Sequence, residues 1–310
     1  MNKFKKISLA VTLLVAMTVA QAENFVVATG DGKSGSTYAR MYKELAQRCN
    51  YSATGLTLAE QETTGSVKNV ELLTGNQVNA AIVQSDLLFW TKMKDETKVA
   101  NVRTLFALHP EELHFVARAD TKKEGGFGVG SFKVGGTSIT YNSVQDLTGR
   151  TVGAVGGSVM SANVVSAKSG LNFSVQEYPN NDAMKQDLLE GKIDAIVAVG
   201  GSPLGLVSSL DQRYRLLPVT ESVQKALADI YQPAKLSYTN LNQAGVPTLA
   251  TQALFVSRTY RSQDVQSQLK KLRDCFVKVV PDIQDARGTH SKWQSVDTAD
   301  KGKWAYYEFK

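Results

Sequence analysis

The chain has 310 residues and a formal net charge of +6, from 35 Lys and Arg against 29 Asp and Glu. Three of the positive charges, Lys3, Lys5 and Lys6, lie at the extreme N-terminus, and the others are scattered. This weak balance argues against a nucleic-acid partner. The length allows one large domain or two lobes, each with its own hydrophobic core.

The first 22 residues have the pattern of a secretory signal peptide. A basic start, MNKFKK, precedes the apolar run ISLAVTLLVAMTV and the small-residue site AQA at 20–22. The alternative, a membrane anchor, needs about 20 apolar residues, and this run is shorter. Cleavage after Ala22 would place the mature protein in the periplasm, where it meets little ATP or NAD. No later stretch is apolar enough to span a membrane.

Strands and helices alternate in the first part of the mature chain. The predicted strands are 25–30, 54–62 and 78–84, and the predicted helices begin near Thr37, Ser66 and Ser85. Apolar residues recur on one face between 37 and 49, as in an amphipathic helix. Alternation of this kind is typical of a mostly parallel α/β sheet.

Two of these helices carry recognisable end signals. The helix that begins at Ser66 should bury Val67, Val70 and Leu73 and end at Gly75 in a C′ position. The pair Ser85-Asp86 has the composition of a helix N-cap.

The same order repeats further along the chain. Strands are predicted at 151–157, 173–178 and 193–199, with helices from Ser158 and over 182–190. The stretches LLTGNQVNAAIV and LLEGKIDAIV even share a local pattern. We therefore expect two lobes of similar construction. Lobe one is predicted at 23–118 plus 248–310 and lobe two at 119–247, with a Gly-rich hairpin or loop near the hinge at 121–143.

The chain has two cysteines, Cys49 and Cys275. In an oxidising compartment they can form a disulfide, which would tie the end of the first helix to a helix near the C-terminus. The alternative is two buried free thiols.

The loop ATGDGKSGSTY at 28–38 overlaps two phosphate-binding patterns. A P-loop needs a glycine five residues before Gly32, and Val27 occupies that position. A dinucleotide-binding fold needs an acidic residue about 20 positions on, whereas Glu60 and Glu62 lie about 30 positions on. Neither pattern is complete, so we expect no nucleotide and no cofactor.

Motifs for catalysis are also incomplete. The stretch HPEELH places His109 and His114 five residues apart, which on a helix would separate them by about 140°. Pro110 favours a turn followed by a strand instead. The pair Ser222 and Lys225 lacks the companion motifs of a serine hydrolase, and no nucleophile elbow or metal-ligand cluster is present. We expect neither an enzyme nor a metal site.

Small polar residues recur where the helices begin. The stretches are SGSTY at 34–38, TTGSV at 63–67, VQSD at 83–86 and VGGSV at 155–159. Free N–H groups and the helix dipole favour an anion at such positions, which gather at the carboxyl ends of the strands. Two lobes that face each other in this way would hold a small carboxylate. For any single serine the alternative is ordinary N-capping.

These segments, together with DLTGRTVGAVGGS and AVGGSP, resemble the TAXI family, the solute-binding receptors of TRAP transporters, over about 25 to 256. The resemblance implies a type II periplasmic-binding-protein fold, in which two lobes with two crossovers surround a ligand cleft. It also implies a small organic acid or amino acid as ligand, such as glutamate, glutamine or a C5 dicarboxylate. A TRAP-type membrane permease would be the partner, and we expect a monomer.

The resemblance further implies a set of ligand-binding positions. These are Gly35, Ser36, Thr37, Tyr38, Gly65, Ser66, Gln84, Ser85, Gly157 and Ser158. To them we add Lys33, a cation in a loop that is commonly neutral in the family. Lys33 either pairs with a second carboxylate of the ligand or is simply solvated.

The hypothesis is a non-enzymatic periplasmic receptor that closes around a small carboxylate and presents it to a permease. Two alternatives stay open at this point. One is a periplasmic sensor that feeds a signalling partner, and the other is an exported hydrolase with an unrecognised nucleophile.

Overall fold

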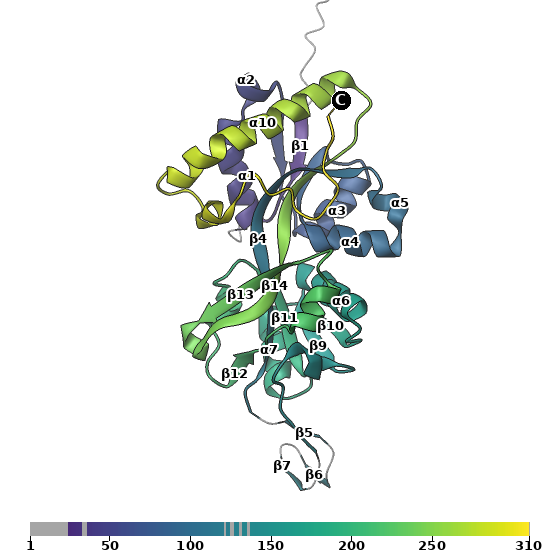
Figure 1. Cartoon of the computed structure of the whole chain (residues 1–310), viewed down its shortest axis with the longest axis vertical. Helices are drawn as coiled ribbons and strands as arrows, with labels where there is room; N and C mark the ends of the chain where they lie inside the picture. The colour runs from purple at the N-terminus through teal and green to yellow at the C-terminus, as the bar shows by residue number, and fades with distance from the viewer. Residues whose placement is uncertain are drawn as a thin grey trace, which may run out of the picture.

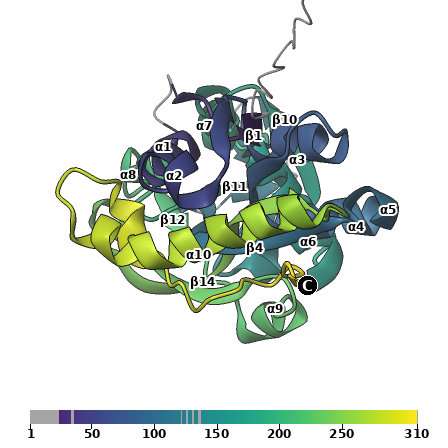
Figure 2. The same cartoon turned by 90° about the horizontal axis from the view of Figure 1, so that it is seen from above.

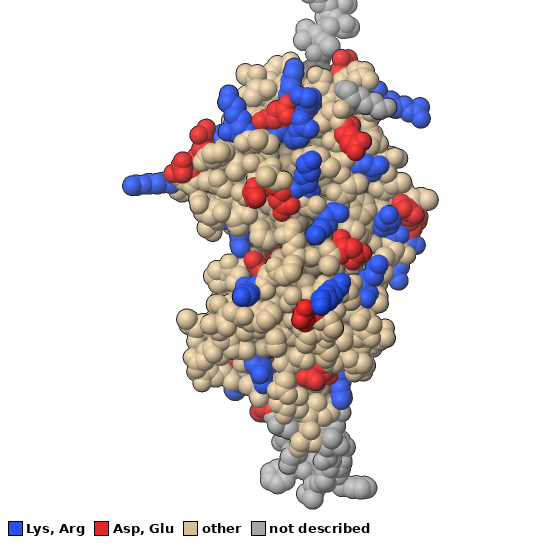
Figure 3. Space-filling view, in the orientation of Figure 1, with Lys and Arg blue, Asp and Glu red and all other residues tan. Residues whose placement is uncertain are grey.

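The computed structural model of the chain describes residues 24–32, 36–120, 122–124, 127–129, 132–134 and 137–309. The predicted signal peptide at 1–22 lies outside the described residues. Two lobes are stacked along the long axis of the molecule (Figure 1). Lys and Arg are interspersed with Asp and Glu over the face seen in Figure 3. Among the described residues, no helix is long and apolar enough to cross a membrane.

The strands of the main sheet are β1 (Asn24–Ala28), β2 (Thr57–Gln61), β3 (Ala80–Gln84), β4 (Val102–Arg118), β9 (Thr151–Val155), β10 (Ser174–Tyr178), β11 (Ala195–Gly200), β12 (Tyr214–Leu216), β13 (Gln232–Tyr238) and β14 (Gln243–Arg258). Four short strands lie outside it: β5 (Lys122–Glu124), β6 (Phe127–Val129), β7 (Phe132–Val134) and β8 (Thr137–Ile139).

The α-helices are α1 (Thr37–Arg48), α2 (Tyr51–Thr54), α3 (Ser66–Thr74), α4 (Ser85–Lys94), α5 (Glu96–Val99), α6 (Gly157–Ser169), α7 (Asn181–Leu189), α8 (Gly205–Ser208), α9 (Glu221–Ala226) and α10 (Gln263–Asp285). The 3-10 helices are η2 (Val144–Leu147), η3 (Thr239–Leu241) and η4 (Ser291–Ser295).

Each lobe is built on the same strand order. The sheet runs β10-β9-β11-β4-β14-β3-β1-β2. In the first lobe β1 lies between β2 and β3, and in the second lobe β9 lies between β10 and β11, all in parallel pairs. An antiparallel strand then follows in each lobe, β14 beside β3 and β4 beside β11. This doubled order confirms the predicted type II periplasmic-binding-protein fold.

Two long antiparallel strands, β4 and β14, pass through both lobes and form the two crossovers. On β4, Leu105 and Phe106 pack into the core of the first lobe, whereas Leu113 and Phe115 pack into that of the second. The lobe boundaries predicted after residues 118 and 247 stay a prediction. The packing along β4 favours boundaries inside the crossing strands.

The stretch HPEELH is part of a continuous strand, so the predicted turn before the strand is wrong. Pro110 lies inside β4 opposite Gln252, where the pairing of β4 with β14 shifts register. Proline is tolerated at such an irregularity because one ladder hydrogen bond is already absent there.

The first helix of the sequence prediction is confirmed, and the second is confirmed except at Val67 and Gly75. On α1 the predicted residues Tyr38, Met41, Tyr42 and Leu45 are all buried. On α3, by contrast, Val67 is 46% exposed. The predicted residues Val70 and Leu73 are buried, and the buried face is centred near Leu73, which lies about 120° around the helix from Val67. Gly75 ends α3 with a φ of −77° and so does not adopt the left-handed C′ conformation that was expected.

A disulfide joins Cys49 at the end of α1 to Cys275 on α10, with 5.8 Å between their Cα atoms. The predicted pairing is confirmed. Helix α10 lies across the first lobe in both views (Figures 1 and 2).

The Gly-rich stretch contains two antiparallel pairs, β5 with β8 and β6 with β7. A hairpin was expected, but its predicted place near the hinge is wrong. Figure 1 shows these strands at the end of the second lobe that faces away from the first lobe. The reason is that β4 crosses the whole second lobe before it ends at Arg118, so the residues that follow begin on the far side of that lobe.

Candidate functional site

A polar cavity of about 290 Å³ lies where the two lobes meet. The first lobe and β4 supply Ser36, Thr37, Tyr38, Thr64, Gly65, Ser66, Gln84 and Glu111, and the second lobe supplies Val155, Gly157, Ser158 and Val199. The cavity therefore lies at the carboxyl ends of strands from both lobes, where ligands of open α/β sheets bind.

The first wall of the cavity is the start of α1. The N-cap residue is Ser36, whose side chain makes no capping hydrogen bond, and its backbone N–H donates to the Asp31 carbonyl at 3.2 Å. A Cβ on Gly30 would lie 1.9 Å from Ser36 Oγ, so only glycine lets the loop approach the helix this closely. The glycine thus positions the Ser36 hydroxyl group and a helix N-terminus at the cavity.

The second wall is the start of α3. Gly65 precedes the helix with a φ of 114°, a backbone conformation that favours glycine. The Ser66 hydroxyl accepts a hydrogen bond from the Gln84 N–H at 3.1 Å and donates to the Tyr38 hydroxyl at 3.4 Å. Ser66 thereby links two other predicted site residues, Tyr38 and Gln84.

The second lobe contributes the start of α6. Its N-cap is Gly156, with a φ of 55°, and Ser158 Oγ accepts a hydrogen bond from the Val199 N–H at 3.0 Å. A Cβ on Gly157 would lie 2.5 Å from Gln84 Oε1 of the first lobe. At this point the two lobes touch across the cavity.

Glu111 is a lining residue that the sequence analysis missed. It lies on β4 between the two cores and is 9% exposed. Its Oε2 accepts a hydrogen bond from the Tyr38 hydroxyl at 2.8 Å, and its Oε1 lies 3.6 Å from His109 Nε2. Burial and the charge of Glu111 raise the pKa of Tyr38 well above its usual range, so the phenol stays protonated.

Other lining residues were also missed. They are Thr64 and Val155, which lie in the stretches TTGSV and VGGSV, and Val199, the last residue of the strand predicted at 193–199. For Glu111 the available signal was an acidic pair inside an otherwise apolar stretch, because a carboxylate within a buried strand needs a functional or structural reason.

Ser85 does not line the cavity. It is fully buried, and its Oγ lies 3.0 Å from Thr251 Oγ1 on β14. It is also the first residue of α4 and not a cap, since the N-cap position belongs to Gln84. Ser85 therefore fastens α4 to a crossing strand. Lys33 and Gly35 lie outside the described residues.

Helices α1, α3 and α6 direct their N-termini at the cavity from both lobes. Unpaired N–H groups and the helix dipoles make such positions favourable for an anion. Among the lining residues that the structure describes, Glu111 is the only Asp, Glu, Lys, Arg or His. Within the same described part of the chain, no group of three His, Cys, Asp or Glu could hold a metal ion.

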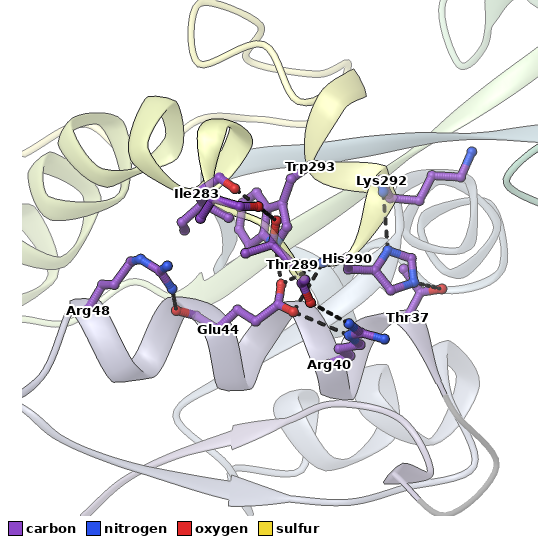
Figure 4. Close-up of polar contacts among 11 residues, drawn as sticks. Thr37, Arg40, Glu44, Arg48, Ile283, Thr289, His290, Lys292 and Trp293 are labelled. Atoms are coloured by element: carbon purple, nitrogen blue, oxygen red, sulfur yellow. Dashed lines mark hydrogen bonds and ion pairs between the residues drawn. The ribbon is translucent and has the colours of Figure 1, made fainter.

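The segment 289–293, which follows α10, packs against α1, the first wall of the cavity (Figure 4). Glu44 of α1 accepts hydrogen bonds from the His290 N–H at 3.1 Å and from Trp293 Nε1 at 2.6 Å. His290 Nε2 lies 3.5 Å from Thr37 Oγ1, which lines the cavity. Burial, with a smaller effect of His109, lowers the pKa of His290 and favours its neutral form.

The same segment reaches the second lobe through Lys292. Its Nζ donates a hydrogen bond to the Ser202 carbonyl at 3.2 Å, and its stem passes so close to Gly201 that a Cβ there would lie 1.9 Å from Lys292 Cε. The Ser202 N–H donates to Glu112 Oε2 at 2.8 Å. The segment 289–293 therefore contacts both lobes next to the cavity.

Two lobes of repeated strand order, two shared crossing strands and a polar cavity between them define the architecture of a type II periplasmic binding protein. The chain belongs to the NMT1-like family, whose model matches residues 27–273.

Solved structures with a related arrangement are distant. A substrate-binding protein of an amino acid ABC transporter is 11% identical, with a TM-score of 0.47, and the match covers 84% of this chain and 94% of that one. A histidine kinase sensor domain similar to periplasmic binding proteins is 13% identical, with a TM-score of 0.48 and coverage of 88% and 96%. An arginine-bound binding protein from Streptococcus pneumoniae is 14% identical, with a TM-score of 0.47 and coverage of 88% and 96%. Similarity this low transfers no ligand to the present chain.

Proposed function

We propose that the protein is a non-enzymatic periplasmic receptor that binds a small carboxylate of the glutamate, glutamine or C5 dicarboxylate class in the cavity between its lobes. The observation that carries this proposal is the convergence of three helix N-termini, from both lobes, on one polar cavity. The family membership of the chain is consistent with it.

In this proposal the ligand joins the two lobes. Its carboxylate would accept hydrogen bonds from the backbone at the starts of α1, α3 and α6, and from the hydroxyl groups of Ser36 and Thr37. Contacts from both lobes stabilise the closed arrangement, and β4 and β14 would bend to allow opening. A ligand that binds the closed form better shifts the population towards it.

The closed receptor would then deliver its ligand to a membrane permease of the TRAP type. The signal peptide predicted at 1–22 supports export, and the resemblance of the sequence to TAXI receptors supports this kind of partner. Uptake by membrane vesicles that contain the permease, measured with and without the purified receptor, tests the delivery step. Binding without stimulated uptake would favour a sensor role.

The binding step is tested by calorimetry of the purified mature protein with glutamate, glutamine and 2-oxoglutarate. Gly157→Ala should weaken binding by about tenfold or more, roughly 1.4 kcal/mol, because the new methyl group displaces Gln84 in the cavity. Gly205→Ala is the matched control, since it is the first residue of α8 in the same lobe with nothing within 4 Å of its Cβ position. The proposal fails if no carboxylate binds, or if both variants bind like wild type.

A further inference from the structure

Glu111 is the feature of the cavity that carboxylate binding alone leaves unexplained. It puts a negative charge on the wall of a cavity whose helix N-termini favour a negative ligand. A ligand carboxylate placed against it would be repelled, because like charges close together in a partly desolvated site destabilise each other. A chain that bound only dicarboxylates would gain nothing from this residue at this place.

The hydrogen bonds around Glu111 all end at its carboxylate. Ser66 donates to the Tyr38 hydroxyl at 3.4 Å, and Tyr38 donates in turn to Glu111 Oε2 at 2.8 Å. The Ser66 oxygen is itself fixed by the N–H of Gln84. The donors are thus arranged to support an ionised carboxylate, and Tyr38 and Ser66 hold it at the cavity surface.

Glu111 Oε1 retains capacity for another donor. Its distance of 3.6 Å from His109 Nε2 is longer than a normal hydrogen bond. The side chain of Glu111 is 11% exposed, and the residue lines the cavity. A donor that enters the cavity can therefore reach this carboxylate.

We propose that Glu111 binds a protonated amino group of the ligand, so that the cavity selects small α-amino acids over the corresponding acids without an amine. This inference rests on the proposed binding of a carboxylate in the same cavity. The cavity then has two electrostatic sides: the starts of α1, α3 and α6 favour the carboxylate, and Glu111 on β4 favours the ammonium group. Its volume of about 290 Å³ suits a small molecule.

His109 offers the competing explanation. It is 1% exposed, its Nδ1 has no hydrogen-bond partner among the described residues, and its Nε2 is the nearest cationic partner that the chain itself offers to Glu111 Oε1, at 3.6 Å. If His109 fills this role, a ligand amine would gain nothing from Glu111. Ligand pairs that differ only in the amine separate the two explanations.

The experiment is calorimetry of the wild-type mature protein at pH 7 with two matched pairs, L-glutamate with glutarate and L-glutamine with glutaramate. We expect the amino acid of at least one pair to bind tenfold or more tightly than its partner. Glu111→Gln should reduce this preference to threefold or less, mainly by weakening the amino acid. Glu62→Gln is the matched control, because that carboxylate lies in the first lobe, pairs with Lys43 and does not line the cavity.

A third variant separates charge from hydrogen bonding. Tyr38→Phe removes the donor to Glu111 but keeps the carboxylate, so the preference for the amine should persist. Equal binding within each pair by the wild-type protein would overturn the role of Glu111 and leave the proposed function standing. A preference that survives Glu111→Gln would also overturn it. If 2-oxoglutarate binds but no member of either pair does, this inference fails and the proposed function stands. If none of these carboxylates binds, both fail. The wild-type comparison decides the matter even if a variant does not fold.

Discussion

The two lobes share a strand order, but their cores are assembled from different parts of the chain. The core of the second lobe is made mainly by residues between 113 and 249, one continuous part of the chain. The core beneath α10 in the first lobe combines residues from both ends of the described chain, such as Phe25 and Tyr307. Bringing such distant segments together costs more conformational entropy. The only disulfide among the described residues is found in that lobe.

Removal of the disulfide should have the largest effect on the difference in stability between the two lobes. The double variant Cys49→Ser, Cys275→Ser should lose about 2–5 kcal/mol of unfolding free energy, because the bond closes a separation of 226 residues. Denaturant titration measures the total loss. Hydrogen exchange should show lower protection in α1 and α10, with β9 and β11 nearly unchanged. An equal loss of protection in both lobes would contradict the difference that we infer.

The second lobe has no such bond, and a buried histidine makes it sensitive to acid. His114 is fully buried, its Nε2 accepts a hydrogen bond from the Tyr238 hydroxyl at 2.8 Å, and its Nδ1 lies 3.3 Å from the Ala198 carbonyl. Burial lowers the pKa of His114 from its usual 6.5 to about 4. In the folded protein the ring is neutral throughout most of the acid range.

The sign of the pH effect follows from this shift. Between pH 6.5 and about pH 4 the unfolded chain binds a proton at His114 that the folded chain does not bind. The free energy of unfolding should therefore fall as the pH falls through this window, by about 3 kcal/mol in total, and His114 should have no effect on the slope above it. Because carboxylates also titrate there, the measurement is the difference between wild type and His114→Gln as a function of pH. A constant difference between pH 7 and pH 4 would refute this role.

The smallest effect is expected where the lobes touch through Lys292. Lys292→Met keeps the aliphatic contact with Gly201 and removes the hydrogen bond to the Ser202 carbonyl. The closed arrangement should lose about 1 kcal/mol or less, which corresponds to a decrease of up to about fivefold in the affinity for the ligand. Small-angle scattering and calorimetry measure the two effects. Lys303→Met, eleven residues further along the chain and outside the lining of the cavity, is the control and should change neither.

Much of the architecture could be predicted because it depends on local pattern. The alternation of strands and helices was sufficient to predict an α/β protein of two similar lobes, and the family resemblance added the type II fold. The two cysteines predicted a disulfide, with two free thiols as the alternative. Most of the predicted cavity residues, including Ser36, Ser66 and Ser158, indeed come together. Each of them follows a strand whose carboxyl end could be recognised in the sequence.

The features that were missed depend on contacts between residues far apart in the sequence, which no local pattern shows. Glu111 was missed because it lies at the point on β4 where the strand passes from the core of the first lobe to that of the second. The sequence does not show where along the strand this point lies. The burial of Ser85 depends on Thr251, which is 166 positions away in the sequence. Periodicity shows which face of an element is buried, but it does not show which lobe that face meets.

The return of the chain to the first lobe also bears on the order of folding during synthesis. Phe25, near the start of the described chain, packs in the same core as Tyr307, close to its end. The core of the first lobe cannot be completed until Tyr307 has emerged, whereas the core residues of the second lobe, between 113 and 249, emerge earlier. Domains usually fold from the N-terminus onward as a chain is made. Here we expect the reverse: the second lobe folds first, and the N-terminal strands of the first lobe fold only after the C-terminal residues of its core are available.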